Sequence, residues 1–238
     1  MADEATNPNT NGPGSGILRQ VLNLEDAILI EPQLHAVTPA QHAARDAADA
    51  VRRLIRGLES TSAPIDQLAN LTAELDRLTR TLTEDLPATT SSEKSTVTYQ
   101  AHRLRERSPF IGQANPVALP LVMEFVEGGI DAVANFSSLY EGPPGCLHGG
   151  YIAGIFDEVL GAAQTFSGHA GMTGRLTIHY RSPTPLNTDL HLRARLESVS
   201  GRKIMCKGTL HAGDLLCAEA EGLFISVDPK KLLGFISS

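Results

Sequence analysis

The chain has 238 residues, and 42% of them are hydrophobic, enough for a substantial core in one large domain or a domain with an extension. The formal net charge is −7, so the chain offers no overall positive field to nucleic acid or to an anionic membrane. No apolar run reaches the roughly 18 residues that a membrane span needs, and the first residues do not resemble a secretory signal. These features predict a cytoplasmic globular protein that binds neither nucleic acid nor membrane.

The cysteines and histidines argue against a metal or disulfide framework. The three cysteines are odd in number and contain no C-x-x-C pair, which favours a reducing compartment. Four histidines are scattered over predicted strands and a loop without ligand spacing: His169, His179, His191 and His211. We therefore expect no metal and no cofactor.

The N-terminal third divides into a tail and a helical hairpin. Residues 1–22 are polar and rich in Asn, Gly and Pro, which predicts a disordered tail, although 17–30 is ambiguous between a short helix and an extended segment. Residues 23–85 predict a hairpin, whose first helix starts with Thr38 as N-cap and runs to about Glu59. The second helix carries leucines at alternating spacings of three and four. This seam (Leu68, Leu71, Leu75, Leu78 and Leu82) is expected to pack in an oligomer or against the sheet that follows.

Residues 86–97 are small and polar and predict a linker, and 98–238 predict the main domain. Two strands around a Gly128–Gly129 turn precede a helix from about Gly149 to Thr165. Four strand patterns then follow in series, at 174–182, 190–199, 202–212 and 215–227. This order predicts an α+β domain in which a curled antiparallel sheet wraps one buried helix.

The buried helix carries two acids where a purely structural helix would carry none. It is apolar on most sides, so Asp157 and Glu158 are costly unless they face a cleft or a partner. Neighbouring helical residues point about 100° apart, so at most one of the two acids is expected in the site. A structural or interface role is favoured for Glu158.

The start of the same helix is suited to binding an oxygen that gains negative charge. The first N–H groups of a helix lack intrahelical acceptors, and Gly149 and Gly150 let a substrate approach the backbone closely. His148 can orient an acyl group or donate to it. Asp157 lies nine residues beyond His148, about 13 Å along the axis, too far to act on the same carbonyl within one chain. A catalytic Asp157 therefore requires a second copy.

Three segments resemble one family. "HGGYIAGIFDEVLG" (148–161) is similar to the H-G-G-x6-D signature of PaaI-like hotdog-fold acyl-CoA thioesterases, and "EGPPGCLHGG" and "MTGRLTIHYRSPTPL" resemble its flanking segments. The resemblance runs from about 107 to 227, roughly half of the chain. It implies a hotdog fold with an N-terminal helical extension, and hydrolysis of an acyl-CoA substrate without a cofactor. It also implies a homodimer that completes the site, with a dimer of dimers left open.

The resemblance also implies roles for four residues. Gly150 N–H would polarise the thioester carbonyl, with His148 as its orienting neighbour. Asp157 would act as general base or nucleophile, and Thr173 would hold the attacking water. Several relatives have Asn where this chain has Gly142, so one water-positioning contact is absent or replaced.

Other candidates and alternatives remain open. Gly149 and Glu158 are substrate-binding candidates beside the catalytic groups. By analogy, CoA phosphates would bind near two pairs of residues, for which solvated surface is an equal alternative: Arg181 with Ser182, and Arg202 with Lys203. Cys146 lacks a general base beside it in sequence and is a weak nucleophile candidate. The rival functions are a hotdog hydratase or dehydratase, and a non-catalytic acyl-CoA-binding or assembly module.

Overall fold

The computed structural model describes residues 37–85 and 106–227. These residues fall into two compact units, 37–118 and 119–227, each of which is described by itself. The predicted tail (1–22), the ambiguous segment (17–30) and the predicted linker (86–97) lie outside the described residues.

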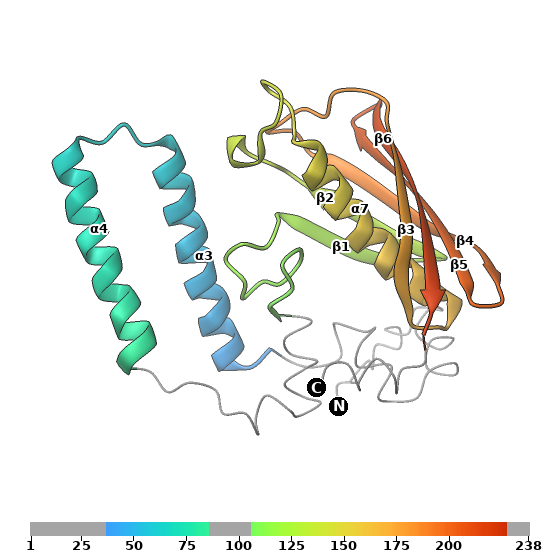
Figure 1. The fold of residues 1–238 in the computed structure, drawn as a ribbon, viewed down its shortest axis with the longest axis horizontal. Helices are drawn as coiled ribbons and strands as arrows, with labels where there is room; N and C mark the ends of the chain where they lie inside the picture. Colours follow the sequence, from blue (N-terminus) through green and yellow to red (C-terminus); the bar gives the residue numbers. More distant parts are fainter. Residues whose placement is uncertain (1–36, 86–105, 228–238) are drawn as a thin grey trace, which may run out of the picture. The chain divides into compact units, whose positions relative to one another are not determined.

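The first unit contains the predicted hairpin, made of α3 (Pro39–Ser60) and α4 (Ile65–Arg80) with a π-helical turn at Thr81–Asp85 (Figure 1). The start of α3 at Thr38 is confirmed. The Thr38 hydroxyl accepts the Gln41 N–H, and the Gln41 side chain accepts the Thr38 N–H. This reciprocal capping box satisfies two donors that a helix start otherwise leaves unpaired.

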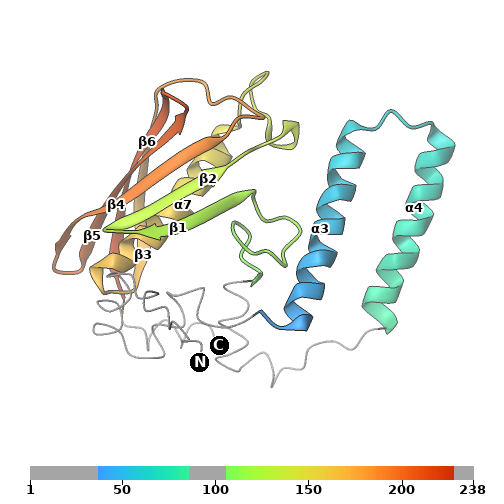
Figure 2. The same ribbon diagram turned by 180° about the vertical axis from the view of Figure 1, so that it is seen from behind.

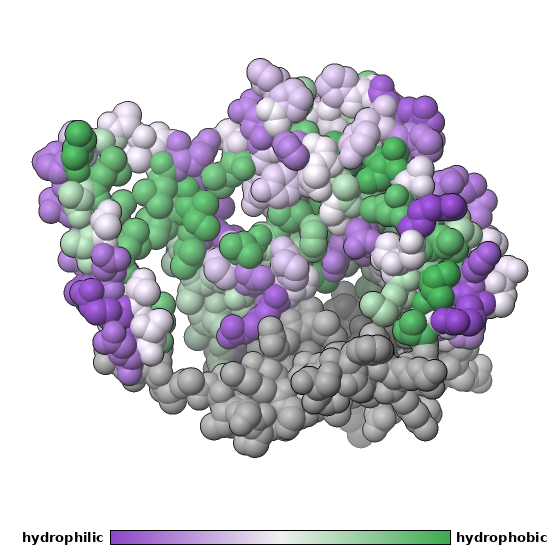
Figure 3. Space-filling model, viewed as in Figure 1, coloured by the Kyte–Doolittle hydropathy of each residue, from purple (hydrophilic) through white to green (hydrophobic). Residues whose placement is uncertain are grey.

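The facing sides of α3 and α4 do not close on each other. A groove runs between them, and its lining residues are Arg53, Leu54, Gly57, Leu58, Thr61, Ala63, Gln67, Leu68 and Leu71. Farther along the seam, Leu78 and Leu82 are 49% and 66% exposed, and hydrophobic residues are visible on the surface of the hairpin (Figure 3). The packing of this leucine seam in an oligomer or against the sheet stays a prediction.

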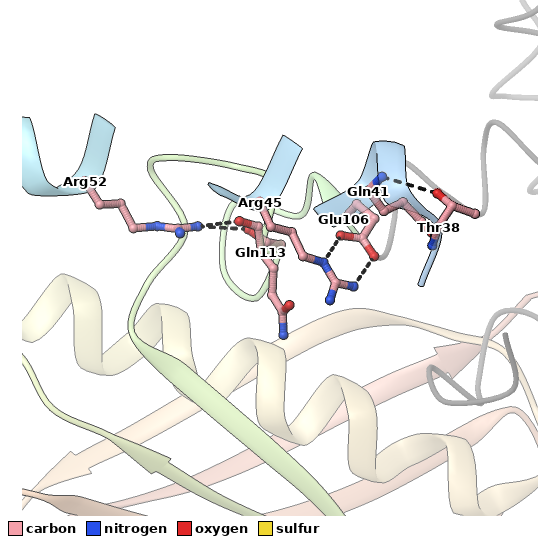
Figure 4. A network of polar contacts seen from close by, with 7 residues as sticks. Thr38, Gln41, Arg45, Arg52, Glu106 and Gln113 are labelled. Atoms are coloured by element: carbon pink, nitrogen blue, oxygen red, sulfur yellow. Dashed lines mark hydrogen bonds and ion pairs between the residues drawn. The ribbon is translucent and has the colours of Figure 1, made fainter. Parts of the chain in front are cut away.

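Residues 106–118 are fastened to α3 by two arginines (Figure 4). Arg45 donates two hydrogen bonds to the carboxylate of Glu106, at 2.6 and 2.9 Å, and Glu106 is only 3% exposed. A buried carboxylate needs such a partner, and the same bond raises the pKa of Arg45. Arg52 donates to three loop carbonyls, those of Gly112, Gln113 and Asn115. The loop thus belongs to the hairpin unit.

The second unit is a six-stranded antiparallel sheet with α7 (Gly149–Ala163) along one face (Figures 1 and 2). The strand order is β1-β2-β4-β5-β6-β3. The strands are β1 (Leu121–Val126), β2 (Gly129–Ala134), β3 (Gly171–Tyr180), β4 (Leu190–Ser200), β5 (Lys203–Ala212) and β6 (Leu215–Ser226). Short 3₁₀ turns at Ser138–Tyr140 and Gln164–Ser167 flank the helix. The predicted α+β pattern is confirmed.

Apolar residues of α7 form the centre of this unit. Ile155, Phe156 and Leu160 are at most 1% exposed. Gly208 of β5 lies beneath them: a Cβ there would sit 3.3 Å from the Phe156 ring and 3.4 Å from Leu160. The missing side chain lets helix and sheet approach closely.

Strand β3 is an edge strand with an irregularity near its start. It pairs only with β6 among the described strands, and Gly174 is left unpaired between Thr173, opposite Phe224, and Arg175, opposite Leu223. Such a bulge shifts the alternation of side chains by one residue. Thr173 and Tyr180 can therefore both face α7, although they are seven positions apart in a strand with a period of two.

Candidate active site

A tight loop at residues 143–148 leads into the start of α7. Gly145 has a φ of 74°, in the left-handed region that favours glycine, and Cys146 N–H donates to Pro143 O at 2.8 Å. The His148 N–H then donates to Tyr140 O at 2.9 Å. These bonds set the direction in which the helix begins.

His148 caps the helix with its own side chain. Its Nδ1 accepts the Gly150 N–H at 3.0 Å, and its ring lies edge-on to Tyr151 with ring centres 6.2 Å apart. Because Nδ1 is used as an acceptor, the proton of the neutral ring lies on Nε2. Gly142 makes room for this arrangement, since a Cβ there would lie 2.8 Å from His148 Cα. An Asn at this position would displace the histidine.

Gly149 presents the free N–H of this helix start. Within residues 37–85 and 106–227 its N–H makes no hydrogen bond, whereas its carbonyl accepts the Tyr180 hydroxyl at 3.0 Å. The family resemblance implies the carbonyl-polarising role for Gly150, but the N–H of that residue donates to His148 Nδ1. We call His148, Gly149, Gly150 and Tyr180 the carbonyl half-site.

Asp157 and Thr173 form a second cluster, the acid half-site. The Thr173 hydroxyl donates to Asp157 Oδ1 at 2.9 Å, and both side chains are exposed. Asp157 lies eight residues along α7 from Gly149, about 12 Å at the rise of an α-helix. The two half-sites are therefore at separate places in one chain.

Glu158 occupies a different environment from its neighbour. It is partly buried, and burial, followed by the negative charge of Asp157, raises the pKa of its carboxyl. Asp157 is the acid that solvent and ligands can reach.

The four residues expected near CoA phosphates do not come together within one chain. Arg181 and Ser182 both donate their N–H groups to Cys217 O, just beyond the Tyr180 end of β3. Lys203 pairs with Ile225 and Arg202 Nε bonds Ser226 O, beside the Gly171 end. A ten-residue strand separates the ends by about 30 Å. Arg181 is moreover ion-paired with Glu219 at 2.7 Å.

The cysteines are not placed for catalysis. Cys206 and Cys217 are buried and Cys146 is half-buried, and all three thiols are free. Burial raises the pKa of the Cys206 thiol to about 12, which removes its nucleophilic thiolate. Within the described ranges, no three potential ligand side chains cluster to hold a metal ion, and no helix is long and apolar enough to cross a membrane.

Two residues of the site, Gly174 and Tyr180, are not predicted as functional residues by the sequence. Gly174 supplies the bulge that aims Thr173, and a glycine inside a strand pattern is a signal for one. Tyr180 reaches the first residue of a helix 31 positions earlier, and no sequence pattern indicates that contact.

Comparisons with known proteins support the family resemblance. Residues 144–219 match the family model of the thioesterase superfamily. A crystal structure described as a thioesterase superfamily protein is 34% identical, with a TM-score of 0.67. That alignment covers 77% of this chain and 90% of the other.

Curated relatives match over a shorter stretch. The acyl-coenzyme A thioesterase THEM4 of Xenopus laevis is 37% identical over 91 residues, 37% of this chain and 41% of that protein. The mouse (Mus musculus) THEM4 is 39% identical over 95 residues, 39% of this chain and 41% of that protein. The alignments thus span about two fifths of these relatives' length. With the helix-wrapping sheet and the matched segment around His148 and Asp157, these likenesses show that the chain is a hotdog-fold member of the thioesterase superfamily.

Proposed function

We propose that the protein is an acyl-CoA thioesterase, which hydrolyses an acyl-CoA thioester to a free acid and CoA. The observation that carries this proposal is the arrangement on α7: a free N–H and a histidine at its start, and an accessible carboxylate bonded by a threonine 12 Å away. The THEM4 relatives are named for the same reaction class.

A homodimer formed through β3 would bring the two half-sites together. No described strand pairs with the outer side of this ten-residue edge strand, and Met172 and Tyr180 on it are more than half exposed. Two copies of β3 pairing antiparallel about a two-fold axis at Thr177 would, with the bulged Gly174 left out of the pairing, set Thr173 opposite the partner's Tyr180. Each carbonyl half-site would then face the acid half-site of the other subunit.

The same pairing would unite the separated CoA candidates. The Gly171 end of one β3 would lie beside the Tyr180 end of the other. Arg202 and Lys203 would therefore approach Arg181 and Ser182 across the interface, where cations and hydroxyls suit phosphate oxygens. A dimer of dimers is compatible with this scheme, as is a reducing, cytoplasmic location for the free cysteines.

In the proposed reaction, the thioester carbonyl oxygen accepts hydrogen bonds from Gly149 N–H and His148 Nε2–H. Both donors, at the positive end of the helix, stabilise the negative charge of the tetrahedral intermediate. Asp157 of the partner subunit takes a proton from a water held by Thr173, and the hydroxide adds to the carbonyl carbon. The C–S bond then breaks, and the CoA thiolate recovers the proton. In the alternative course, Asp157 attacks directly and water hydrolyses the resulting anhydride.

The decisive experiment removes the base. We expect Asp157→Asn to lower kcat by at least about 100-fold, because the amide can neither accept the proton nor attack. Activity is measured as thiol release from acyl-CoAs of different chain length and aromaticity. Asp214→Asn, the same change at an exposed turn residue, serves as the matched control.

Three outcomes are distinguishable. Loss of turnover in Asp157→Asn alone supports the proposal, and full activity in a folded Asp157→Asn protein refutes the mechanism. Tight acyl-CoA binding by the wild type without thiol release would instead identify a non-catalytic acyl-CoA-binding module.

A further inference from the structure

We propose that Tyr180 is a positioning residue, which holds His148 in its Nε2–H form through the peptide group that joins Gly149 to Gly150. The inference rests on the proposed function, in which His148 Nε2–H donates to the thioester oxygen. It assigns a role to an aromatic side chain on the edge strand that the motif around His148 does not include.

Two hydrogen bonds share one peptide group. The Tyr180 hydroxyl donates to Gly149 O at 3.0 Å, and the N–H of that same peptide group, which belongs to Gly150, donates to His148 Nδ1 at 3.0 Å. A hydrogen bond to an amide oxygen polarises the amide and strengthens its N–H as a donor. The hydroxyl therefore acts on the imidazole without touching it.

The consequence for His148 is a defined tautomer. The Gly150 N–H requires a lone pair on Nδ1, so in the neutral ring the proton stays on Nε2. A weaker Gly150 donor allows the other tautomer, in which Nε2 carries a lone pair and repels the carbonyl oxygen. Ring contacts with Tyr151 fix the plane of the imidazole but do not choose between its nitrogens.

Besides its hydrogen bond, Tyr180 makes a packing contact with the start of α7. A Cβ on Gly149 would lie 3.5 Å from the tyrosine ring, so the ring is in van der Waals range of the first helical residue. Tyr180 keeps this contact although it is 56% exposed. The hydroxyl and the ring together orient both donors of the carbonyl half-site: Gly149 N–H and His148 Nε2–H.

The test is Tyr180→Phe in the full chain, which removes the hydroxyl and keeps the ring. We expect kcat to fall about tenfold with KM changed less than about twofold, because the lost bond acts on the donors rather than on substrate binding. The ¹⁵N shifts of the His148 ring, assigned by their loss in His148→Gln, should show one Nε2–H form in the wild type and a tautomer mixture in Tyr180→Phe. Thr209→Val is the matched control, since it removes a hydroxyl from the inner strand β5, next to Gly208 and therefore on the face of the sheet turned away from α7.

Each outcome of these measurements supports or overturns the positioning role of Tyr180. An unchanged tautomer and kcat in Tyr180→Phe overturn the proposal, and a raised KM at unchanged kcat reassigns Tyr180 to substrate contact. Equal losses in Thr209→Val would show a general effect of losing a sheet hydroxyl and would overturn the proposal. The tautomer measurement needs no turnover, so a wild type that hydrolyses no acyl-CoA would refute the proposed function while the tautomer shift still tests the role of Tyr180.

Discussion

At the scale of single residues, Gly149 and Gly150 differ in what their backbone N–H groups do. Gly150 N–H is bonded to His148, whereas Gly149 N–H, at the first position of α7, has no acceptor among the described residues. A thioester oxygen would therefore meet Gly149 first. Gly150 contributes by orienting the histidine.

Gly149→Pro tests this difference. Proline suits the first helical position, and His148 already has the extended ψ of 134° that a residue before proline prefers, so the helix start should survive. The variant lacks the N–H, and we expect kcat to fall about 100- to 1000-fold, as for the loss of one oxyanion donor. Initial-rate kinetics on the best acyl-CoA substrate provide the measurement.

Gly149→Ala is its matched control, because it keeps the N–H and adds only a Cβ in ordinary contact with Tyr180. It should retain activity within about threefold of the wild type. Equal activities of the proline and alanine variants would return the donor role to Gly150.

At the scale of elements, a contact in the structure explains the glycine in β3, whereas none explains the leucine seam of α4. The unpaired Gly174 brings Thr173 onto the helix-facing side of its strand, where it bonds Asp157. The seam of α4 has the heptad-like spacing of a helix that packs against another, yet α3 leaves it largely open. The first pattern is explained by a contact within the chain, and the second is not.

We expect the seam to be covered in the assembled protein. Leu75→Glu combined with Leu82→Glu should either lower the solution mass, if the seam joins copies, or lower Tm by several degrees at unchanged mass, if it packs within the chain. Light scattering and thermal unfolding separate the two cases. Asn70→Glu, at an exposed position of α4, is the control, and an unchanged mass and Tm in the double variant would contradict both.

At the scale of the whole molecule, the proposed function makes catalysis a property of the dimer, because the two half-sites lie at separate places in one chain. A heterodimer of one Asp157→Asn subunit and one Gly149→Pro subunit would carry both defects in one site and neither in the other. Purified by two different tags after co-expression, it should recover about half of the wild-type activity, because one of its two sites is intact.

Each homodimer should stay nearly inactive under the same conditions. If both half-sites served one active site within a single chain, every site of the heterodimer would be damaged. The heterodimer would then recover no activity, and this result would refute the proposal that a dimer paired through β3 forms the active site.

Patterns of short range were sufficient for much of the fold. Thr38 and Pro39 marked a helix start that the capping box confirms, and the apolar run from Gly149 marked the buried helix. These predictions worked because capping and periodicity depend on neighbouring residues alone. The bonds from Arg52 to the carbonyls of residues 112–115 join groups about 60 positions apart, and nothing local indicates them.

For the site, the sequence by itself determined that His148 and Asp157 lie too far apart along one helix to act on the same carbonyl. The separation of nine positions between His148 and Asp157 imposes about 13 Å along one helix, because the rise per residue is constant, and this alone called for a second copy. Only the tertiary structure decided that Gly150 N–H is occupied, that Gly149 N–H has no acceptor in the described part of the chain, and that Tyr180 reaches the helix start. Those contacts depend on the register of β3 against α7, which is set by packing across the whole sheet and by one unpaired glycine.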